Sequence, residues 1–343
     1  MAETTRCEAL AIAAIKASRV ITADDILRLD FTPDLTEGGI SCACCALSHI
    51  YFRAGSTAIA HLRHTVAQVA VELALRRHLV AERVPFEVQA AVPFTDPSRF
   101  DVSVRGHRCE IRTFLITDPT QIPSIQMDPG LLLEASALVP LDQYSAEGQS
   151  SEDLYFFAFV LSRSIDVVVH STRSATSEER MHLVYVMPGS WAHPRDWIPL
   201  GPIVLKSEDP GTLGLEIGGQ DRERGNLACR AVLPPHTRLE LAADLHSLTY
   251  LHVESRPMGR LGVRSPTRKE TQVINPTEWR SIWIDGTDIY VAGWITREQF
   301  RQRARLVREG SRVLQYSRTR TKNLAVPISD LKPLAQLFER ARL

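Results

Sequence analysis

A short segment of the chain places two carboxylates and a guanidinium at a spacing that suits chemistry on phosphate esters. Asp101 begins one apolar run, and Glu110 and Arg112 lie in the next, with the turn-like sequence 105–108 between the two runs. Side chains alternate along a strand, so Glu110 and Arg112 should face the same way while Ile111 points into the core. With Asp101 on the neighbouring strand of a hairpin, the three side chains should converge at one end of a sheet.

Phosphodiester hydrolysis needs such a set, because two carboxylates hold hard divalent cations that activate water and neutralise charge on the phosphorus. The segment resembles the PD-(D/E)xK nuclease superfamily, which has the restriction-endonuclease-like fold, over about residues 58–162. The resemblance implies that Asp101 and Glu110 bind Mg²⁺ or Mn²⁺ and that Arg112 takes the catalytic place of the family's lysine. It also implies that Glu72, on the preceding helix, is a further metal ligand.

Arg112 is the departure from the family pattern that matters most. Arginine stays protonated, whereas a lysine can shift its pKa and presents a point charge. Arg112 could clamp a phosphate or an attacking water, or it could mark a fold that has lost cleavage. A structural explanation also stands: an Asp at a strand start often caps a turn, and Glu and Arg on one strand face often form a solvated pair. Glu72 could equally be a surface acid of an amphipathic helix.

A cysteine cluster is the second candidate site. Cys42 and Cys45 have the spacing of a zinc knuckle, and His61 and His64 share a helical face. These four residues could build a structural Zn²⁺ site. The histidine pair is spaced more tightly than in zinc fingers, and cysteine is among the most buried residue types, so packed free thiols are the favoured explanation.

A basic run near the C-terminus is the third candidate. Residues 297–322 hold nine Arg or Lys and two Glu, a local excess of +7 on a chain whose formal net charge is +0. We expect a basic helix over residues 296–308, with Arg301, Arg305 and Arg308 on one face. The segment 317–322 adds cationic and hydroxyl donors for phosphates. The residues expected to bind nucleic acid are Arg301, Arg305, Arg308, Arg318, Arg320 and Lys322. A solvated cationic face or a protein contact is the alternative.

The composition indicates to which broad class of protein the chain belongs. The chain has 343 residues, of which 44% are hydrophobic and 23% charged, as in ordinary globular proteins of more than one domain. No segment has the roughly 18 apolar residues that a membrane span needs. We therefore expect no membrane partner. Six cysteines in a chain of this length suggest reduced thiols, and hence a cytoplasmic protein.

The apolar pattern predicts a mixed α/β protein, α+β overall. We expect a small helical unit over residues 1–55, with helices at residues 8–17 and, after the N-cap Thr22, at residues 23–29, followed by an irregular stretch around Gly38 and Gly39. A restriction-endonuclease-like domain should follow over residues 56–165, with a mixed sheet flanked by helices. In that domain residues 58–83 should form a long helix, residues 131–139 a second helix and residues 154–161 a strand buried on both faces. Residues 180–343 should form a β-rich domain that ends in a basic helix and an amphipathic helix.

The resulting hypothesis is a metal-dependent DNA endonuclease-like protein, in host defence or DNA processing, whose C-terminal domain guides the DNA backbone. The alternative is a catalytically inactive nuclease-like module that binds nucleic acid or a partner protein, within a complex or as a homo-oligomer.

Overall fold

The computed structural model describes residues 21–47, 58–89, 100–145, 150–164 and 182–342. The chain divides into two compact units. Unit 1 comprises residues 1–31, 71–161 and 288–343, and unit 2 comprises residues 32–70 and 162–287. The predicted boundaries at residues 55 and 180 differ from this division, because segments distant in sequence share a sheet.

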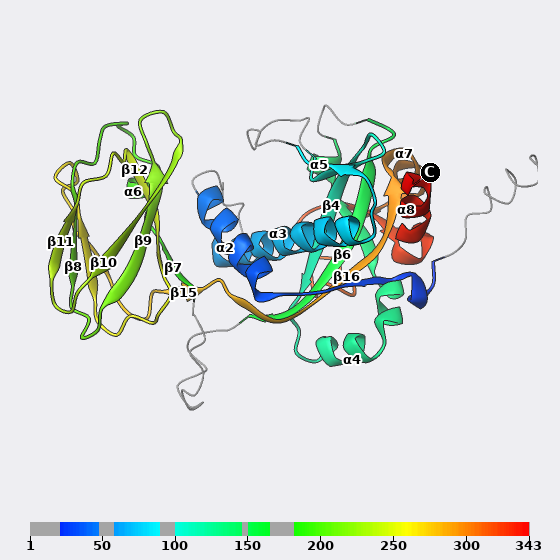
Figure 1. Ribbon diagram of the computed structural model, residues 1–343, viewed down its shortest axis with the longest axis horizontal. Coiled ribbons are helices and arrows are strands. Elements are labelled where there is room, and N and C mark those ends of the chain that lie inside the picture. Colours follow the sequence, from blue (N-terminus) through cyan, green and yellow to red (C-terminus); the bar gives the residue numbers. More distant parts are fainter. Residues whose placement is uncertain (1–20, 48–57, 90–99, 146–149, 165–181, 343) are drawn as a thin grey trace, which may run out of the picture. The chain divides into compact units, whose positions relative to one another are not determined.

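Unit 1 is built on a six-stranded sheet that combines strands from the N-terminal and C-terminal parts of the chain (Figure 1). Its strands, in neighbouring order, are β1 (Leu27–Leu29), β16 (Ile284–Thr296), β6 (Leu154–Ser164), β4 (His107–Ile116), β3 (Val102–Val104) and β2 (Phe86–Glu87). β4 and β6 run parallel, whereas the pairs β2–β3, β3–β4 and β1–β16 are antiparallel. The buried strand predicted over residues 154–161 is confirmed, since every side chain in that range is buried. The expected α+β class is therefore confirmed.

A second, three-stranded sheet of unit 1 has the order β17-β18-β5, with β17 at Arg305–Val307, β18 at Asn323–Pro327 and β5 at Ser136–Pro140. The helix predicted over residues 131–139 is wrong in its second half, because β5 pairs along its length with β18. Tertiary pairing outweighs local propensity here. Further helices are α4 (Gln121–Met127), α5 (Leu141–Tyr144), α7 (Arg297–Arg303) and α8 (Leu334–Arg342).

The core of unit 1 is rich in aromatic side chains. Phe157, Phe159 and Phe300 are fully buried, and the rings of Phe157 and Phe300 stack with centroids 6.1 Å apart. Tyr155 meets Phe300 edge-on at 5.4 Å. These contacts fix α7 against β6, so the residues at the start of α7 lie close to the start of that strand.

The helix α2 (Pro33–Ala46) corrects the irregular stretch expected around Gly38 and Gly39. Pro33 occupies the first turn, where its missing N–H costs nothing. A Cβ added at Gly39 would lie 2.6 Å from the carbonyl oxygen of Val66 on α3 (Ala58–Ala81). The glycine therefore permits close packing of the two helices. The helix predicted at residues 8–17 lies outside the described residues. The helix expected after Thr22 is one 3-10 turn, Ala23–Asp25, followed by β1.

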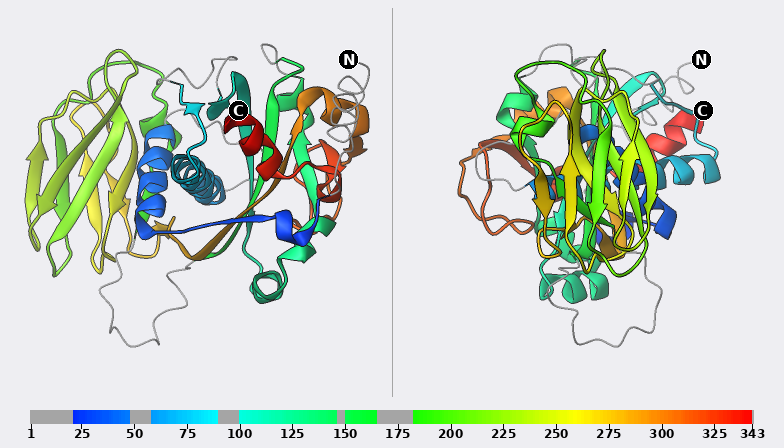
Figure 2. Two further views of the ribbon diagram at one scale, coloured as in Figure 1. Left: turned by 45° about the vertical axis from the view of Figure 1, so that its right-hand side comes forward. Right: turned by 90° about the vertical axis from the view of Figure 1, so that its left-hand side faces the viewer.

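The β-rich part of unit 2 is a sandwich of two antiparallel sheets (Figure 2). One has the order β10-β9-β12-β7-β15 and the other β11-β8-β13-β14. Leucine and isoleucine side chains from both sheets form one buried cluster. The strands are β7 (Leu183–Val186), β8 (Ile203–Ser207), β9 (Leu213–Gln220), β10 (Asn226–Leu233), β11 (Arg238–Leu241), β12 (Ser247–Val253), β13 (Leu261–Arg264), β14 (Gln272–Ile274) and β15 (Arg280–Ser281).

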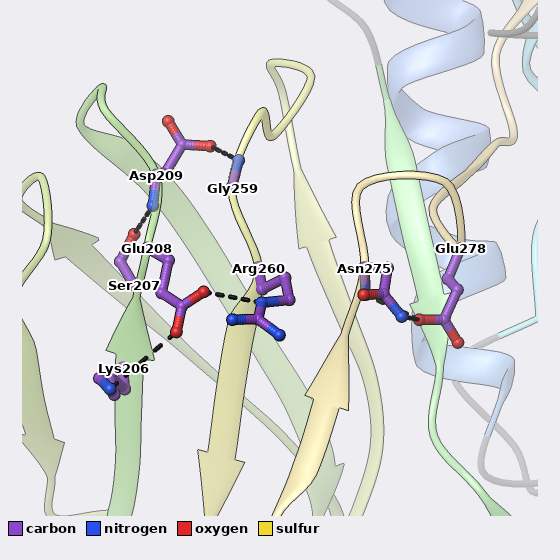
Figure 3. Close-up of polar contacts among 8 residues, drawn as sticks. All are labelled: Lys206, Ser207, Glu208, Asp209, Gly259, Arg260, Asn275 and Glu278. Carbon is purple, nitrogen blue, oxygen red and sulfur yellow. Dashed lines mark hydrogen bonds and ion pairs between the residues drawn. The ribbon is translucent and has the colours of Figure 1, made fainter.

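One buried carboxylate organises the loops at an end of this sandwich (Figure 3). Asp209 is 4% exposed, and its oxygens accept hydrogen bonds from the backbone N–H groups of Gly211, Met258 and Gly259. A Cβ at Gly259 would lie 2.3 Å from the backbone of Glu208, so only glycine fits this close approach. Burial opposes ionisation of Asp209, but the three hydrogen bonds outweigh it and lower the pKa of the carboxyl group.

Candidate functional site

The hairpin predicted between the two acids is present in unit 1. β3 and β4 pair antiparallel from Val102 opposite Cys109 onwards, and the turn residues Arg105 and Gly106 have positive φ of 55° and 76°. The backbone N–H of Asp101 donates to the carbonyl of Cys109 at 3.1 Å. Asp101 therefore lies at the end of the ladder, directly beyond its last pair, Val102 and Cys109.

The Asp101 side chain caps the end of this ladder. It is 8% exposed, and its Oδ2 accepts a hydrogen bond of 2.7 Å from the backbone N–H of Ile111. A buried carboxylate that satisfies a backbone donor stabilises the local turn whatever else it does.

Glu110 and Arg112 face the same way, as strand alternation predicts, and they form an ion pair. The Arg112 Nη2 lies 2.6 Å from the Glu110 Oε1, and the Arg112 Nη1 donates to the side-chain oxygen of Gln143 on α5. The Nη2–Oε1 contact lacks hydrogen-bond geometry, so it is an electrostatic contact between two charges. Arg112 thus has two protein partners.

Glu72 on α3 also has a cationic partner. Its carboxylate accepts a hydrogen bond from Arg76, one helical turn away, and Arg76 donates a second bond of 3.0 Å to the carbonyl of Asp101. Glu72 and Arg76 therefore tie α3 to the start of β3. Across the described residues, no three His, Cys, Asp or Glu side chains are grouped so that they could hold a metal ion.

Two residues that the sequence did not single out complete this region. Arg297, at the start of α7, donates from Nη1 to the hydroxyl of Tyr155 at 3.2 Å and from Nη2 to the carbonyl of Tyr144. Its guanidinium also lies over the Tyr144 ring, 4.5 Å from the centroid. Tyr155 lies opposite Glu110 on the neighbouring strand. Burial, reinforced by the charge of Glu110, raises the pKa of Tyr155 to about 12, so the hydroxyl keeps its proton.

The cysteine cluster lies on α2, which holds Cys42, Cys44 and Cys45, and none of the three forms a disulfide bond. Cys44 is buried, and burial raises the pKa of its thiol, as it does for Cys45. Cys44 is thus a packed thiol, whereas Cys42 and Cys45, the two predicted zinc ligands of this helix, are exposed. His61 and His64 lie together in the first turns of α3.

The basic helix predicted over residues 296–308 is wrong in its second half. α7 ends at Arg303, Ala304 is extended, and Arg305 and Leu306 belong to β17, which pairs with β18. Arg301, Arg305 and Arg308 therefore do not share one helical face. Residues 305–307 pair as a strand with β18 instead, with Leu306 opposite Leu324.

The basic residues instead follow a β-hairpin, which we define as residues 305–327 and call the basic hairpin. It carries six exposed cations and one acid, Glu309. The cations are Arg305, Arg308, Arg312, Arg318, Arg320 and Lys322. Buried Thr319 orders the connecting loop by donating to the carbonyl of Arg308 at 2.7 Å and accepting from the N–H of Ser311 at 3.1 Å. Outside the hairpin, Arg301 is paired with Glu298 at 2.7 Å.

Comparison with known proteins gives no relative: no family model matches the chain, and neither does any curated protein or solved structure. Among the helices of the described residues, none is both long and apolar enough to span a membrane.

Proposed function

We propose that this chain binds nucleic acid, DNA foremost, through the basic hairpin of unit 1. The observation that carries the proposal is the row of six exposed cations with a single acid among them. Within the described ranges, no carboxylate forms an ion pair with Arg305, Arg308, Arg312, Arg318 or Lys322. Cations that no protein carboxylate neutralises attract the phosphate backbone, and Ser311, Ser317 and Thr321 add hydroxyl donors.

The acids favour a nuclease-like module that binds without cutting. Glu110 is ion-paired with Arg112, Glu72 is bonded to Arg76, and Asp101 accepts from the N–H of Ile111. A cation shared by these carboxylates would need their oxygens at about 2.0–2.6 Å. As they lie, the three acids accept hydrogen bonds from the protein or pair with its arginines, so no catalytic step is derived from a metal ion.

Metal-dependent phosphodiester hydrolysis is the second candidate, and the strand arrangement is what favours it. The order β6-β4-β3-β2, with β4 parallel to β6 and Asp101 at the end of the β3–β4 ladder, fits the mixed sheet expected of a restriction-endonuclease-like core. In this candidate Asp101, Glu110 and Glu72 would be the ligands and Arg112 would replace the catalytic lysine. Glu110 would have to exchange Arg112 for the cation.

The hairpin proposal is tested by replacing Arg305, Arg308 and Arg318 together with glutamine. Each phosphate contact contributes about 0.9 to the slope of log affinity against log salt for duplex DNA. The triple variant should therefore lose about 2.7 of that slope. Fluorescence anisotropy with a labelled duplex and with an RNA of the same sequence, at several salt concentrations, measures the affinity and the slope.

The matched control replaces three exposed cations of unit 2, Lys206, Arg238 and Arg264, with glutamine. It removes the same charge but leaves the hairpin intact, so affinity and slope should stay near those of the wild type. An equal loss in both variants would show that only net charge matters, and the hairpin assignment would be wrong.

Plasmid cleavage separates the two candidates. With Mg²⁺ or Mn²⁺ present, the binding module should not nick supercoiled DNA, and calorimetry should detect no tight divalent-metal site. Cleavage by the wild type that is lost in Asp101→Ala would establish the hydrolytic candidate instead.

A further inference from the structure

The side chain of Tyr155 lies at the centre of a group of charges on unit 1. The guanidinium of Arg112 lies 5.8 Å from its ring centroid, and Arg297 donates to its hydroxyl. Glu110 is its neighbour across the strand pair. α5 and α7 lie at the same end of the sheet (Figure 1), and α5 contributes Gln143 and the carbonyl of Tyr144. We call these residues the Tyr155 site.

The charges of the Tyr155 site leave one positive charge uncompensated. Glu110 neutralises Arg112 across 2.6 Å. Arg297 is half-buried, and no carboxylate of the described residues forms an ion pair with it. Its partners are instead a phenol hydroxyl, a carbonyl and an aromatic ring, all of them uncharged. Removing a guanidinium from water without a counter-charge is costly, so a bound anion would stabilise it.

Unused hydrogen-bonding atoms lie in the same group. The Arg112 Nε and Nη2 and the Glu110 Oε2 are buried and make no hydrogen bond. Buried polar atoms normally have a partner, and exceptions of this kind often mark a position that a ligand or water occupies. The guanidinium groups of Arg112 and Arg297 therefore both lie beside Tyr155, and Arg112 keeps two N–H groups that make no hydrogen bond.

The Tyr155 site is also connected to the basic hairpin. The backbone N–H of Leu141, the first residue of α5, donates to the carbonyl of Lys322 at 3.0 Å. The last cation of the hairpin thus adjoins the short helix that carries Gln143 and Tyr144. A strand of nucleic acid bound along the hairpin would reach the Tyr155 site beyond Lys322.

We propose that the Tyr155 site binds one phosphodiester group of the nucleic acid, with Arg297 supplying the charge and Arg112 supplying further donors. A phosphodiester carries one negative charge, which matches the single uncompensated charge of the site. The inference rests on the proposed function and adds a second, more buried contact to it. It assigns phosphate binding to Arg297, because the charge of Arg112 is already taken by Glu110.

The test uses Arg297→Gln and Arg297→Lys in the full chain, with the duplex anisotropy assay. Arg297→Gln should bind about tenfold more weakly and lose about 0.9 of the salt slope, as expected for one charge-assisted phosphate contact. Arg297→Lys keeps the charge but not the planar fork, so it should keep the slope and lose affinity several-fold. Circular dichroism confirms folding, and if Arg297→Gln is unfolded, Arg297→Lys decides.

Arg301→Gln is the matched control, because Arg301 lies on the same helix but is exposed and paired with Glu298. It should bind within about twofold of the wild type. If the hairpin variant loses binding while both Arg297 variants match Arg301→Gln, this inference fails and the proposed function stands. If the wild type does not bind the duplex at all, the proposed function itself fails.

Discussion

Glu110→Gln should make the protein bind duplex DNA more tightly while making it less stable. The substitution keeps the shape of the side chain but removes the charge that neutralises Arg112 at 2.6 Å. The guanidinium then becomes a second uncompensated cation at the Tyr155 site.

The magnitude follows from the pair's surroundings. Opposite charges about 4 Å apart attract by about 4 kcal/mol at the effective dielectric constant near a protein surface. The Glu110 side chain is 33% exposed and that of Arg112 13% exposed, so solvent screening and desolvation offset most of this attraction. The net contribution to stability should be about 1 kcal/mol, near the upper end for exposed pairs. On the binding side, one released cation should add about 0.9 to the salt slope.

The assays are urea denaturation for stability and duplex anisotropy at several salt concentrations for binding. Glu298→Gln is the control, since it releases Arg301 from an exposed pair on α7 and changes the net charge equally. If Glu298→Gln tightens binding as much as Glu110→Gln does, the effect belongs to net charge alone. Unchanged or weaker binding by Glu110→Gln would refute the argument that the ion pair with Glu110 keeps the charge of Arg112 from attracting phosphate.

Two further predictions concern the sandwich of unit 2. Asp209→Asn should destabilise the sandwich by about 2 kcal/mol in urea denaturation. An amide nitrogen replaces one accepting oxygen, and a hydrogen bond to a charged acceptor contributes about 1.5–3 kcal/mol. Because the pKa of Asp209 is lowered in the folded protein, this stabilisation is fully present above the ordinary Asp pKa of about 3.9. It is lost as the pH falls through the lower folded-state pKa. The stabilities of the variant and the wild type should therefore converge in acid. Gly218→Ala should lower the free energy of unfolding by about 1–3 kcal/mol in the same assay, because its Cβ would lie 1.9 Å from the Tyr250 ring. Gly214→Ala on the same strand is the control. Its Cβ meets nothing within 4 Å, so its stability should be near that of the wild type.

Local patterns in the sequence were sufficient to predict much of the fold. The turn at Arg105 and Gly106 predicts the β3–β4 hairpin, and the uninterrupted apolar run of β6 predicts a strand covered on both faces. The β-rich character of the region that forms the sandwich was also predictable, because alternation and flanking Pro or Gly act over a few residues. In each of these cases the determining interactions lie within one element or between neighbours in the chain.

Contacts between distant segments could not be predicted in this way. β16 joins the sheet of unit 1 and pairs with β1, although more than 250 residues separate Leu29 from Ile289. The bond between Arg297 and Tyr155 spans 142 residues, so neither residue carried a local signal beyond membership of a basic run and an apolar strand. The strand β17 was missed for the same reason, since its helix-forming residues extend only because β18 pairs with them.

The acids show how one spacing supports two chemistries. Strand alternation places Glu110 and Arg112 on the same side, and it places them there equally well for a catalytic pair and for an ion pair. The same sequence also has Glu72 and Arg76 four residues apart on a helix, a spacing that favours pairing of the two side chains. Each of these glutamates thus has an arginine within reach along its own element, and Asp101 has the N–H of Ile111. A divalent cation would have to displace two arginines to gather these carboxylates. Arg297, in contrast, forms no ion pair with a carboxylate of the described residues. We therefore expect an anion to bind beside Arg297, where no ion pair has to be broken first.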